Sequence, residues 1–316
     1  MHWRIKGLVQ KTLSHMPLGV GVNDGLQRTV GGLQRFVRAV ATKVEDWADL
    51  VDRLAELGVR PAGLRFLEIG TGRFPTLPLC FSIAGARFCT TYDLHRNLSP
   101  RLTVKMLRAL QKSLPRIAAA AGRPLCECES AYAALSSAGN VADLFRAARM
   151  DYHAPADAAV TGLPDESVDV IFSNSVLEHV EPDSMEAIMR ESRRTLSRDG
   201  VAIHCVNCGD HYAYFDRRIT PINYLKYPKA DWRFWDNRLL YQNRLRPMDF
   251  LRIAEQAGLQ IVLDVHRPKP ALMAKLEHMA IAPEFCNYPA EQLCTTSVTF
   301  AARKSHGGVD LLAGCR

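Results

Sequence analysis

The segment Leu67 to Gly72, Leu-Glu-Ile-Gly-Thr-Gly, constrains the fold of this chain more than any other. An apolar run ends there in an acid and two glycines, and a backbone without Cβ atoms can turn sharply and let a ligand come close. A second apolar run ends in Tyr92-Asp93. A glycine turn followed about 20 residues later by an acid, which accepts ribose hydroxyls, is typical of a nucleoside site in a βαβ unit. We therefore expect an adenosine-containing ligand.

The residues after the glycine pair narrow the choice of ligand. A dinucleotide fingerprint would need a third glycine at position 75, which is Pro75, and Arg73 and Phe74 precede it. A pyrophosphate favours small residues at a helix N-terminus, so this pattern argues against NAD and FAD. The sequence also lacks the lysine-containing phosphate loop of the P-loop proteins. An acid two residues before the first glycine suits a ligand with a positively charged end.

Apolar runs and turn residues predict the architecture. Strands that alternate with helices indicate a parallel, doubly wound sheet, and its ligands bind at the carboxyl ends of the strands. A last pair of apolar runs would close the sheet as an antiparallel hairpin. The predicted class is α/β, a doubly wound, Rossmann-like seven-stranded sheet with an N-terminal helical extension and a helical insertion. The expected strands are 64–70, 86–92, 150–156, 168–173, 201–207, 260–265 and 297–301.

Four ordered segments carry a resemblance to a known family: residues 67–72, 90–94, 155–180 and 193–205. Across residues 60–265 the chain resembles the class I S-adenosylmethionine (SAM) dependent methyltransferases. The resemblance implies that SAM is the cofactor, with both glycines of the first motif beneath its methionine and ribose. It places Asp93 on the ribose hydroxyls, Asp157 and Ala158 at the adenine amine, and Asn174 near the sulfonium. The implied cofactor-binding residues are Glu68, Gly70, Thr71, Gly72, Asp93, Leu94, Asp157, Ala158 and Asn174.

Helices are expected before the first strand and after Asp93. Apolar spacing predicts helices at 2–16 and 24–57, then at 101–121 and 130–150. These helices suggest a cap at 1–60, a SAM-binding domain at 61–305 and a tail at 306–316. Within the domain, the insertion 98–150 and a substrate or lid segment at 209–246 lie outside the nucleoside core. We expect these added segments to cover the cofactor and to define the substrate pocket.

The composition limits the cellular compartment and the binding partners that can be expected. No apolar stretch reaches about 18 residues, so no membrane span is expected. The N-terminus lacks the apolar core of a secretion signal, and nine cysteines lie without a framework spacing, so the sequence predicts a cytoplasmic protein with reduced thiols. The net charge of +7 is spread along the chain, which argues against a nucleic-acid partner and leaves a small-molecule substrate. The sequence leaves the oligomeric state open.

The segment after the fifth strand holds the candidates for substrate chemistry. A hydroxyl or amine acceptor gains from a general base, usually a histidine or a carboxylate. The candidates are His211 and Asp210 in this segment and His179 after the fourth strand, with Asn174 or His211 positioning the nucleophile. Aromatic faces attract a sulfonium as they attract ammonium. One aromatic side chain is therefore expected at the methyl donor, chosen from Tyr212, Tyr214, Trp232 and Trp235.

A metal site is not expected. Cys205 and Cys208 with His211 have a spacing that could hold zinc with one further ligand. However, Cys205 falls inside a predicted strand, no second CxxC pair exists, and Cys126 and Cys128 lie far away in the sequence. The acids after the fourth strand, Glu178 and Glu181, are too few to predict a magnesium site of the kind used for catechol acceptors.

Three activities share the same nucleoside site. The first is methylation of a small metabolite or glycan precursor in a biosynthetic pathway, including secondary metabolism. In the second, the α-amine of SAM attacks its own γ-carbon, giving azetidine-2-carboxylate and methylthioadenosine. Known azetidine-2-carboxylate synthases resemble methyltransferases in sequence. The third is SAM binding without catalysis, although a degraded glycine turn or a lost Asp93 would be its sign and neither is seen.

Overall fold

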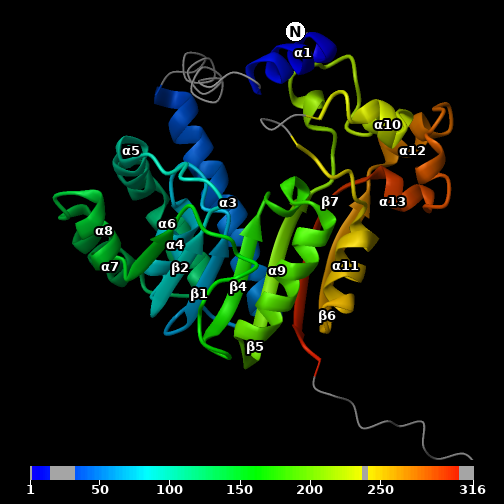
Figure 1. The fold of residues 1–316 in the computed structure, drawn as a ribbon. Coiled ribbons are helices and arrows are strands. Elements are labelled where there is room, and N and C mark those ends of the chain that lie inside the picture. Colours follow the sequence, from blue (N-terminus) through cyan, green and yellow to red (C-terminus); the bar gives the residue numbers. More distant parts are fainter. Residues whose placement is uncertain (1, 15–32, 237–240, 306–316) are drawn as a thin grey trace, which may run out of the picture.

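The computed structural model describes residues 2–14, 33–236 and 241–305 of the 316-residue chain. In this part a seven-stranded sheet runs in the order β3-β2-β1-β4-β5-β7-β6. β7 is antiparallel to β5 and β6, and the other neighbours are parallel, as the doubly wound prediction requires (Figure 1). The strands are β1 (Arg65–Ile69), β2 (Phe88–Tyr92), β3 (Met150–His153), β4 (Val168–Asn174), β5 (Leu196–Asn207), β6 (Leu259–Pro268) and β7 (Thr295–Lys304).

The central strands are apolar on both faces because helices cover both faces of the sheet. On one face lie α3 (Leu33–Glu56), α4 (Thr76–Ile83) and α6 (Leu114–Ala121) (Figure 1). Their core is aromatic: the ring of Phe81 lies 4.0 Å from that of Phe66 and 5.0 Å from that of Phe172. This packing holds β1 and β4 side by side, and their carboxyl ends open onto the glycine turn.

The opposite face is only partly covered. Helices α9 (Pro182–Thr195) and α11 (Pro247–Gln256) pack on the half that contains β4 to β7. The connection from β3 to β4, residues 154–167, forms no helix. The same face of β1, β2 and β3 is therefore left without a helical cover.

The crossover after Asp93 contains more breaks than the sequence predicted. The expected helix 101–121 is α5 (Pro100–Leu110), a 3-10 turn (Gln111–Ser113) and α6, and the break precedes Pro115, which lacks the N–H that a continuous helix needs. The expected helix 130–150 is α7 (Leu125–Ser136) and α8 (Val141–Ala147). Asn140 caps α8 by accepting a hydrogen bond from the Asp143 N–H.

Other boundaries also differ from the sequence prediction. β5 begins at Leu196, and Asp199-Gly200, expected as a turn before the strand, lies at an irregularity in its pairing with β4. The expected N-terminal helices are seen as α1 (Trp3–Ser14) and α3, and the expected helical positions 15, 16 and 24–32 lie outside the described residues.

A third core sits beyond the carboxyl ends of β5 and β6 and the start of β7 (Figure 1). It joins α1 to the segment after β5 and to the segment between β6 and β7, which the sequence left unassigned. Its elements are α1, 3-10 turns at His211–Tyr214, Asn223–Lys226 and Pro283–Phe285, and helices α10 (Lys229–Trp232), α12 (Pro270–Leu276) and α13 (Ala290–Cys294). Among the described helices, none has the length and apolarity to cross a membrane.

Candidate functional site

The turn after β1 has the conformation that its glycines predict. Gly70 and Gly72 have φ angles of 84° and 69°, in the left-handed region that glycine enters without strain. The Gly70 N–H donates to the Tyr92 carbonyl at 2.8 Å, which ties the turn to β2. A Cβ atom at Gly70 would lie 2.5 Å from Val176 Cγ2, whereas the space beside Gly72 is open. The packing of the protein therefore requires a glycine at position 70, whereas Gly72 leaves room for a ligand.

Asp93 stands beside this turn, as the spacing predicted. One of its carboxylate oxygens accepts from the Gly72 N–H at 2.8 Å, and the other accepts from the His95 N–H at 3.1 Å. The Asp93 carbonyl accepts from the Ala156 N–H at 3.0 Å, which brings the stretch with Asp157 and Ala158 to the same edge. Backbone donors thus hold the acid at the end of β2.

Glu68 lies beneath the turn and is almost fully buried. Its carboxylate accepts from the Thr91 hydroxyl at 2.8 Å, and the hydroxyls of Thr71 and Thr91 hydrogen-bond each other. Burial raises the pKa of Glu68 to about 8, although the Thr91 hydrogen bond and the Lys43 charge act against this shift. A cationic group brought close to this carboxyl would favour its charged form. Glu68 can therefore respond to a positively charged ligand end.

The residues expected at the adenine form an open rim. Asp157 is exposed, and its carboxylate accepts from the Ala159 N–H at 2.8 Å, while Ala158 is buried. Leu94 is 61% exposed at the same edge of the sheet. The rim thus offers an acid and an apolar surface, which suit a purine with an exocyclic amine.

Asn174, at the end of β4, connects this edge of the sheet to helix α3. Its amide donates to Asp46 Oδ2 of α3 at 3.1 Å, and Lys43 forms an ion pair with the same carboxylate at 3.4 Å. The rings of Phe36 and Phe74 lie 5.4 Å apart, so α3 also touches the glycine turn. The sequence analysis missed Lys43 and Asp46, which belong to no motif and are visible only as polar residues of an amphipathic helix.

A cavity of about 360 Å³ begins at Asn174 and continues along the carboxyl ends of β4 and β5 and the start of β7. Its lining is largely polar on one side and includes Asn174, Asn207, Asp210, Tyr214, Lys269 and Thr296. The Asn207 amide hydrogen-bonds the Tyr214 hydroxyl. The cavity thus starts where the cofactor motifs end, and its wall comes from the segment after β5.

His211 is a buried candidate base that lies beside this cavity. Its ring centroid is 5.0 Å from that of His179 and 5.6 Å from that of Tyr214, a cavity residue. Burial lowers the pKa of His211 to about 4, and the neighbouring His179 contributes to that shift. The imidazole is therefore neutral at neutral pH and has a free lone pair, although the lowered pKa makes it a weaker base. Gln242 supports the turn by accepting from the His211 N–H at 3.3 Å.

Asp210 begins the turn that carries His211. Its carboxylate accepts from the Tyr212 N–H at 2.8 Å and from the Asn223 amide at 3.2 Å. Burial raises the pKa of Asp210 to about 6, and these hydrogen bonds oppose the shift. The same carboxylate that lines the cavity thus also holds the local backbone.

Of the four aromatic residues expected at the methyl donor, one lines the cavity. Tyr212, Trp232 and Trp235 pack around Trp3, with ring centroids 5.4, 6.1 and 4.8 Å from that of Trp3. The Tyr212 hydroxyl also donates to the Trp235 carbonyl at 2.9 Å. Tyr214 is 68% exposed and belongs to the cavity wall. The aromatic density after β5 thus forms mainly the docking site of α1.

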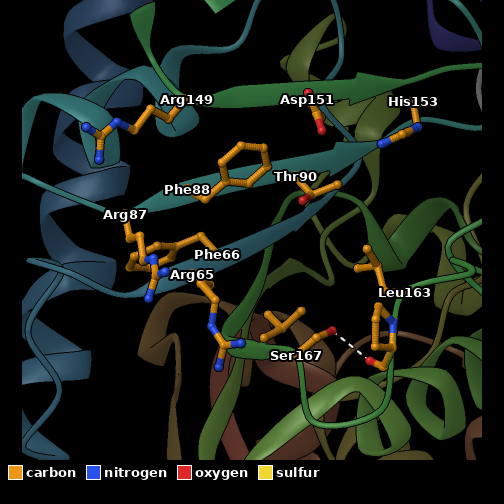
Figure 2. A pocket seen from close by; sticks show the side chains of 12 residues that line it. Arg65, Phe66, Arg87, Phe88, Thr90, Arg149, Asp151, His153, Leu163 and Ser167 are labelled. Atoms are coloured by element: carbon orange, nitrogen blue, oxygen red, sulfur yellow. Dashed lines mark hydrogen bonds between the residues drawn. The ribbon is translucent and has the colours of Figure 1, made fainter. Parts of the chain in front are cut away.

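A second cavity, of about 460 Å³, lies on the uncovered face of β1, β2 and β3. Figure 2 shows Arg65, Arg87 and Arg149 near the starts of these strands, with Leu163 and Ser167 of the β3–β4 connection on the other side. Arg65 pairs with Asp169 at 2.8 Å. Because ligands of doubly wound sheets bind at the carboxyl ends of the strands, this cavity is separate from the glycine turn.

Comparisons with known proteins agree with this geometry. A family model described as a methyltransferase domain matches residues 34–264, which is more than half of the chain. The solved structure of magnesium protoporphyrin IX methyltransferase from Synechocystis PCC 6803, with bound SAH, is similar at 15% identity and a TM-score of 0.46, over 93% of this chain and 100% of that one.

Another similar structure is geranyl diphosphate C-methyltransferase from Streptomyces coelicolor A3(2), at 12% identity and a TM-score of 0.42, over 81% of this chain and 78% of that one. No curated protein sequence matches the chain. The family match covers the glycine turn, Asp93, Asp157 and Asn174 in order along one sheet edge. SAM is the cofactor of this fold, and the chain belongs to the class I SAM-dependent methyltransferases.

Proposed function

We propose that this protein transfers the methyl group of SAM to a small acceptor bound in the cavity at Asn174. The observation that carries the proposal is the position of that cavity. It begins at Asn174, the last residue of β4, on the same edge as the Gly70–Gly72 turn and Asp93. A methyl donor seated on the turn would therefore present its sulfonium to the cavity.

The side chains at this edge of the sheet suggest which part of the cofactor each of them contacts. Asp93 accepts the ribose hydroxyls, the open space beside Gly72 admits the nucleoside, and Glu68 lies under the cationic methionine end. Asp157 and Ala158 meet the adenine, with Leu94 as an apolar neighbour. A charged acceptor of hydrogen bonds is worth about 1.5–3 kcal/mol, which makes Asp93 the most sensitive single side chain of this set.

The acceptor is a small polar molecule. A volume of about 360 Å³ is at the lower end of ligand cavities, which span about 300–1,000 Å³. Asn207, Asp210, Lys269 and Thr296 supply both donors and acceptors to its wall. This lining suits a hydroxylated metabolite or glycan precursor, such as an intermediate of a biosynthetic pathway.

The transfer itself needs orientation and one proton acceptor. The acceptor oxygen or nitrogen attacks the methyl carbon in line, the sulfonium–methyl bond breaks, and SAH leaves as a neutral thioether. The proton of the nucleophile passes to the neutral His211 imidazole, whose lowered pKa keeps it unprotonated. Asn174 orients the nucleophile from the end of β4.

The helical segments form a cover over this site. α3 reaches Asn174 through Asp46, and the Ser99 N–H donates to the Arg73 carbonyl at 2.9 Å, which joins the insertion 98–150 to the glycine turn. α1 rests on the 209–246 segment through Trp3. We expect SAM to protect these segments from limited proteolysis, and an unchanged cleavage pattern would contradict a covering role.

Mass spectrometry of the products tests the proposed activity. The purified protein is incubated with SAM carrying a labelled methyl group, alone and with a fractionated metabolite extract. We expect SAH and a labelled product only when extract is present, and their loss in Asp93→Ala but not in Asp143→Ala, an acid of α8. Methylthioadenosine from SAM alone would instead show cyclisation or lysis of SAM, and azetidine-2-carboxylate beside it would identify cyclisation. SAM binding without any product would show a non-catalytic protein.

A further inference from the structure

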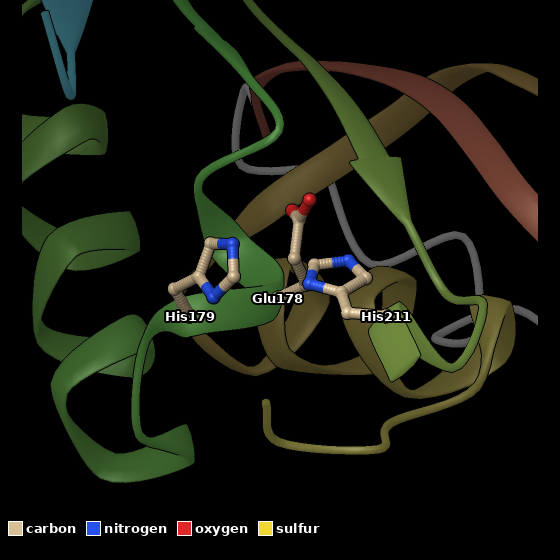
Figure 3. A group of neighbouring side chains, drawn as sticks. All are labelled: Glu178, His179 and His211. Atoms are coloured by element: carbon tan, nitrogen blue, oxygen red, sulfur yellow. The ribbon is translucent and has the colours of Figure 1, made fainter. Parts of the chain in front are cut away.

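Three potential metal ligands converge beside the acceptor cavity. Glu178 and His179 come from the 3-10 turn after β4 (Leu177–His179), and His211 comes from the turn after β5. One donor atom of each residue lies within 4.8 Å of the donor atoms of the other two. Figure 3 shows the Glu178 side chain between the two imidazole rings. Residues on different strand ends thus meet as a compact group.

The buried members of this group lack partners. Glu178 is 1% exposed, and no well-formed hydrogen bond from the described residues reaches either of its carboxylate oxygens; the backbone N–H groups of Glu178 and Asn207 lie close enough only for a weak interaction. His211 is 8% exposed, and its Nε2 atom also has no partner within the described chain. A buried polar atom without a partner typically costs about 1–3 kcal/mol. A cation between these groups would satisfy several of them at once.

The orientation of His179 is already set for ligation. Its Nδ1 atom lies 2.6 Å from the Tyr241 carbonyl oxygen, which can only accept a hydrogen bond. The proton of the neutral ring is therefore on Nδ1, and the lone pair of Nε2 is available. Metal-binding histidines typically have this arrangement, in which a carbonyl or a carboxylate fixes the ring and its tautomer.

We propose that Glu178, His179 and His211 bind a divalent transition-metal ion. Two imidazoles and one carboxylate suit zinc, cobalt or manganese better than calcium or magnesium, which prefer oxygen ligands. Zinc–nitrogen bonds of about 2.0–2.1 Å place tetrahedral ligands about 3.4 Å apart, so the group would close by about 1.5 Å or less on binding. Three protein ligands leave one position open.

This site departs from the sequence expectation of no metal. The cysteine pair considered there is not part of it: Cys205 accepts from the Thr299 hydroxyl inside β5, and only His211 of that motif belongs to the group. The ion would lie next to Tyr214, whose ring is 5.6 Å from His211 and which lines the acceptor cavity. The site goes beyond the proposed methyl transfer, and its existence does not depend on it. A His211 nitrogen that binds the ion cannot also accept a proton, so the base role proposed for His211 applies to the metal-free protein.

Zinc binding to the metal-free, full-length protein tests the site. Calorimetry would measure affinity and stoichiometry, and cobalt would report the ligand set by its visible absorption. We expect one equivalent of zinc, and at least tenfold weaker binding in Glu178→Gln and in His179→Ala. Glu178→Gln keeps the side-chain volume, and His179 is exposed, so both variants should fold, which circular dichroism checks. His278→Ala removes an exposed histidine elsewhere and should leave the affinity unchanged.

The outcomes separate this site from the methyltransferase proposal. Equal zinc affinity in the wild type and in both folded variants, or well under one equivalent in the wild type, would overturn the metal site. SAM affinity is measured on the same samples. Variants that lose zinc but retain SAM assign the metal to this group. A wild type that binds zinc but never binds SAM would overturn the proposed function and leave the metal site standing.

Discussion

The cofactor half and the acceptor half of the sheet edge are built in different ways. The cofactor half, β1 and β2 with their turns, is held by hydrogen bonds of the backbone: Gly70 to Tyr92, and Gly72 and His95 to the Asp93 carboxylate. The acceptor half comprises the ends of β4 and β5 and the segment 209–246. It is held by side chains from distant segments, such as Asn174 with Asp46, 128 residues away.

The difference shows that the sequence specifies local backbone conformation more directly than it specifies contacts between distant segments. A turn with positive φ angles constrains residue type at each position, so its sequence is readable without its surroundings. A side-chain contact between distant segments constrains only size and polarity, which many sequences satisfy. We therefore expect the cofactor half to respond to single backbone substitutions, and the acceptor half to respond to the loss of packing between its segments.

Gly70→Ala should have the largest effect on the cofactor half, because it combines two costs. The left-handed backbone costs an alanine about 1–2 kcal/mol, and the clash with Val176 adds about 1–3 kcal/mol of overpacking. Stability in denaturant should fall by about 2–5 kcal/mol, and SAM affinity should fall with it. Gly72→Ala meets open space, so it should lose SAM affinity with a stability loss of only about 1–2 kcal/mol. Equal stability losses would contradict this difference.

Trp3→Ala should affect the acceptor half alone. Trp3 is 3% exposed, and its backbone N–H donates to Asp216 of the acceptor segment at 2.9 Å. Removing a buried tryptophan side chain typically costs about 3–5 kcal/mol. We expect this loss to loosen α1 and the segment 209–246, and turnover to fall while the SAM dissociation constant changes by less than twofold. Calorimetry and a product assay on the same sample measure both, and a parallel loss of SAM binding would show that the two halves are coupled.

Asp93→Ala should affect the cofactor half with a smaller, defined energy. The variant removes the proposed ribose acceptor and also the acceptor of the Gly72 and His95 N–H groups. SAM binding should weaken by about 1.5–3 kcal/mol, or about 10- to 150-fold. Asp157→Ala, on the exposed rim, should weaken it less. Unchanged affinity in Asp93→Ala would remove this acid from the cofactor site.

The same contrast explains which parts of the structure could be predicted from the sequence. The sheet, the glycine turn and Asp93 were predictable because apolar period and backbone conformation are local properties. The breaks before Pro115 and after Ser136, and the whole segment between β6 and β7, depend on how short helices pack, and short apolar runs do not specify that.

The acceptor half was predictable only as a set of residue types. The sequence predicted Asn174 near the sulfonium, and it offered His211 and His179 only as candidate bases. It gave no means to see that Glu178 would be buried without a partner beside both histidines. Nor did it show that Trp232 and Trp235 would pack on Trp3 instead of the cavity, since the partner is more than 200 residues away along the chain.

The smallest predicted effect concerns the core beneath the acceptor half, where His204 of β5 is fully buried and its Nδ1 atom lies 2.8 Å from the Ser173 hydroxyl oxygen. Burial lowers the pKa of His204 to about 3, against about 6.5 in the unfolded chain. The unfolded state therefore binds a proton below about pH 6.5 that the folded state does not, and stability falls as pH falls. Between pH 7 and pH 5 this linkage lowers the free energy of unfolding by about 2 kcal/mol.

His204→Gln keeps a polar group near Ser173 without the titration, so its stability should fall about 2 kcal/mol less over that interval. Urea unfolding at both pH values measures the difference, with exposed His278→Gln as the control that should behave like the wild type. If His204→Gln also loses as much stability as the wild type, acid sensitivity arises elsewhere.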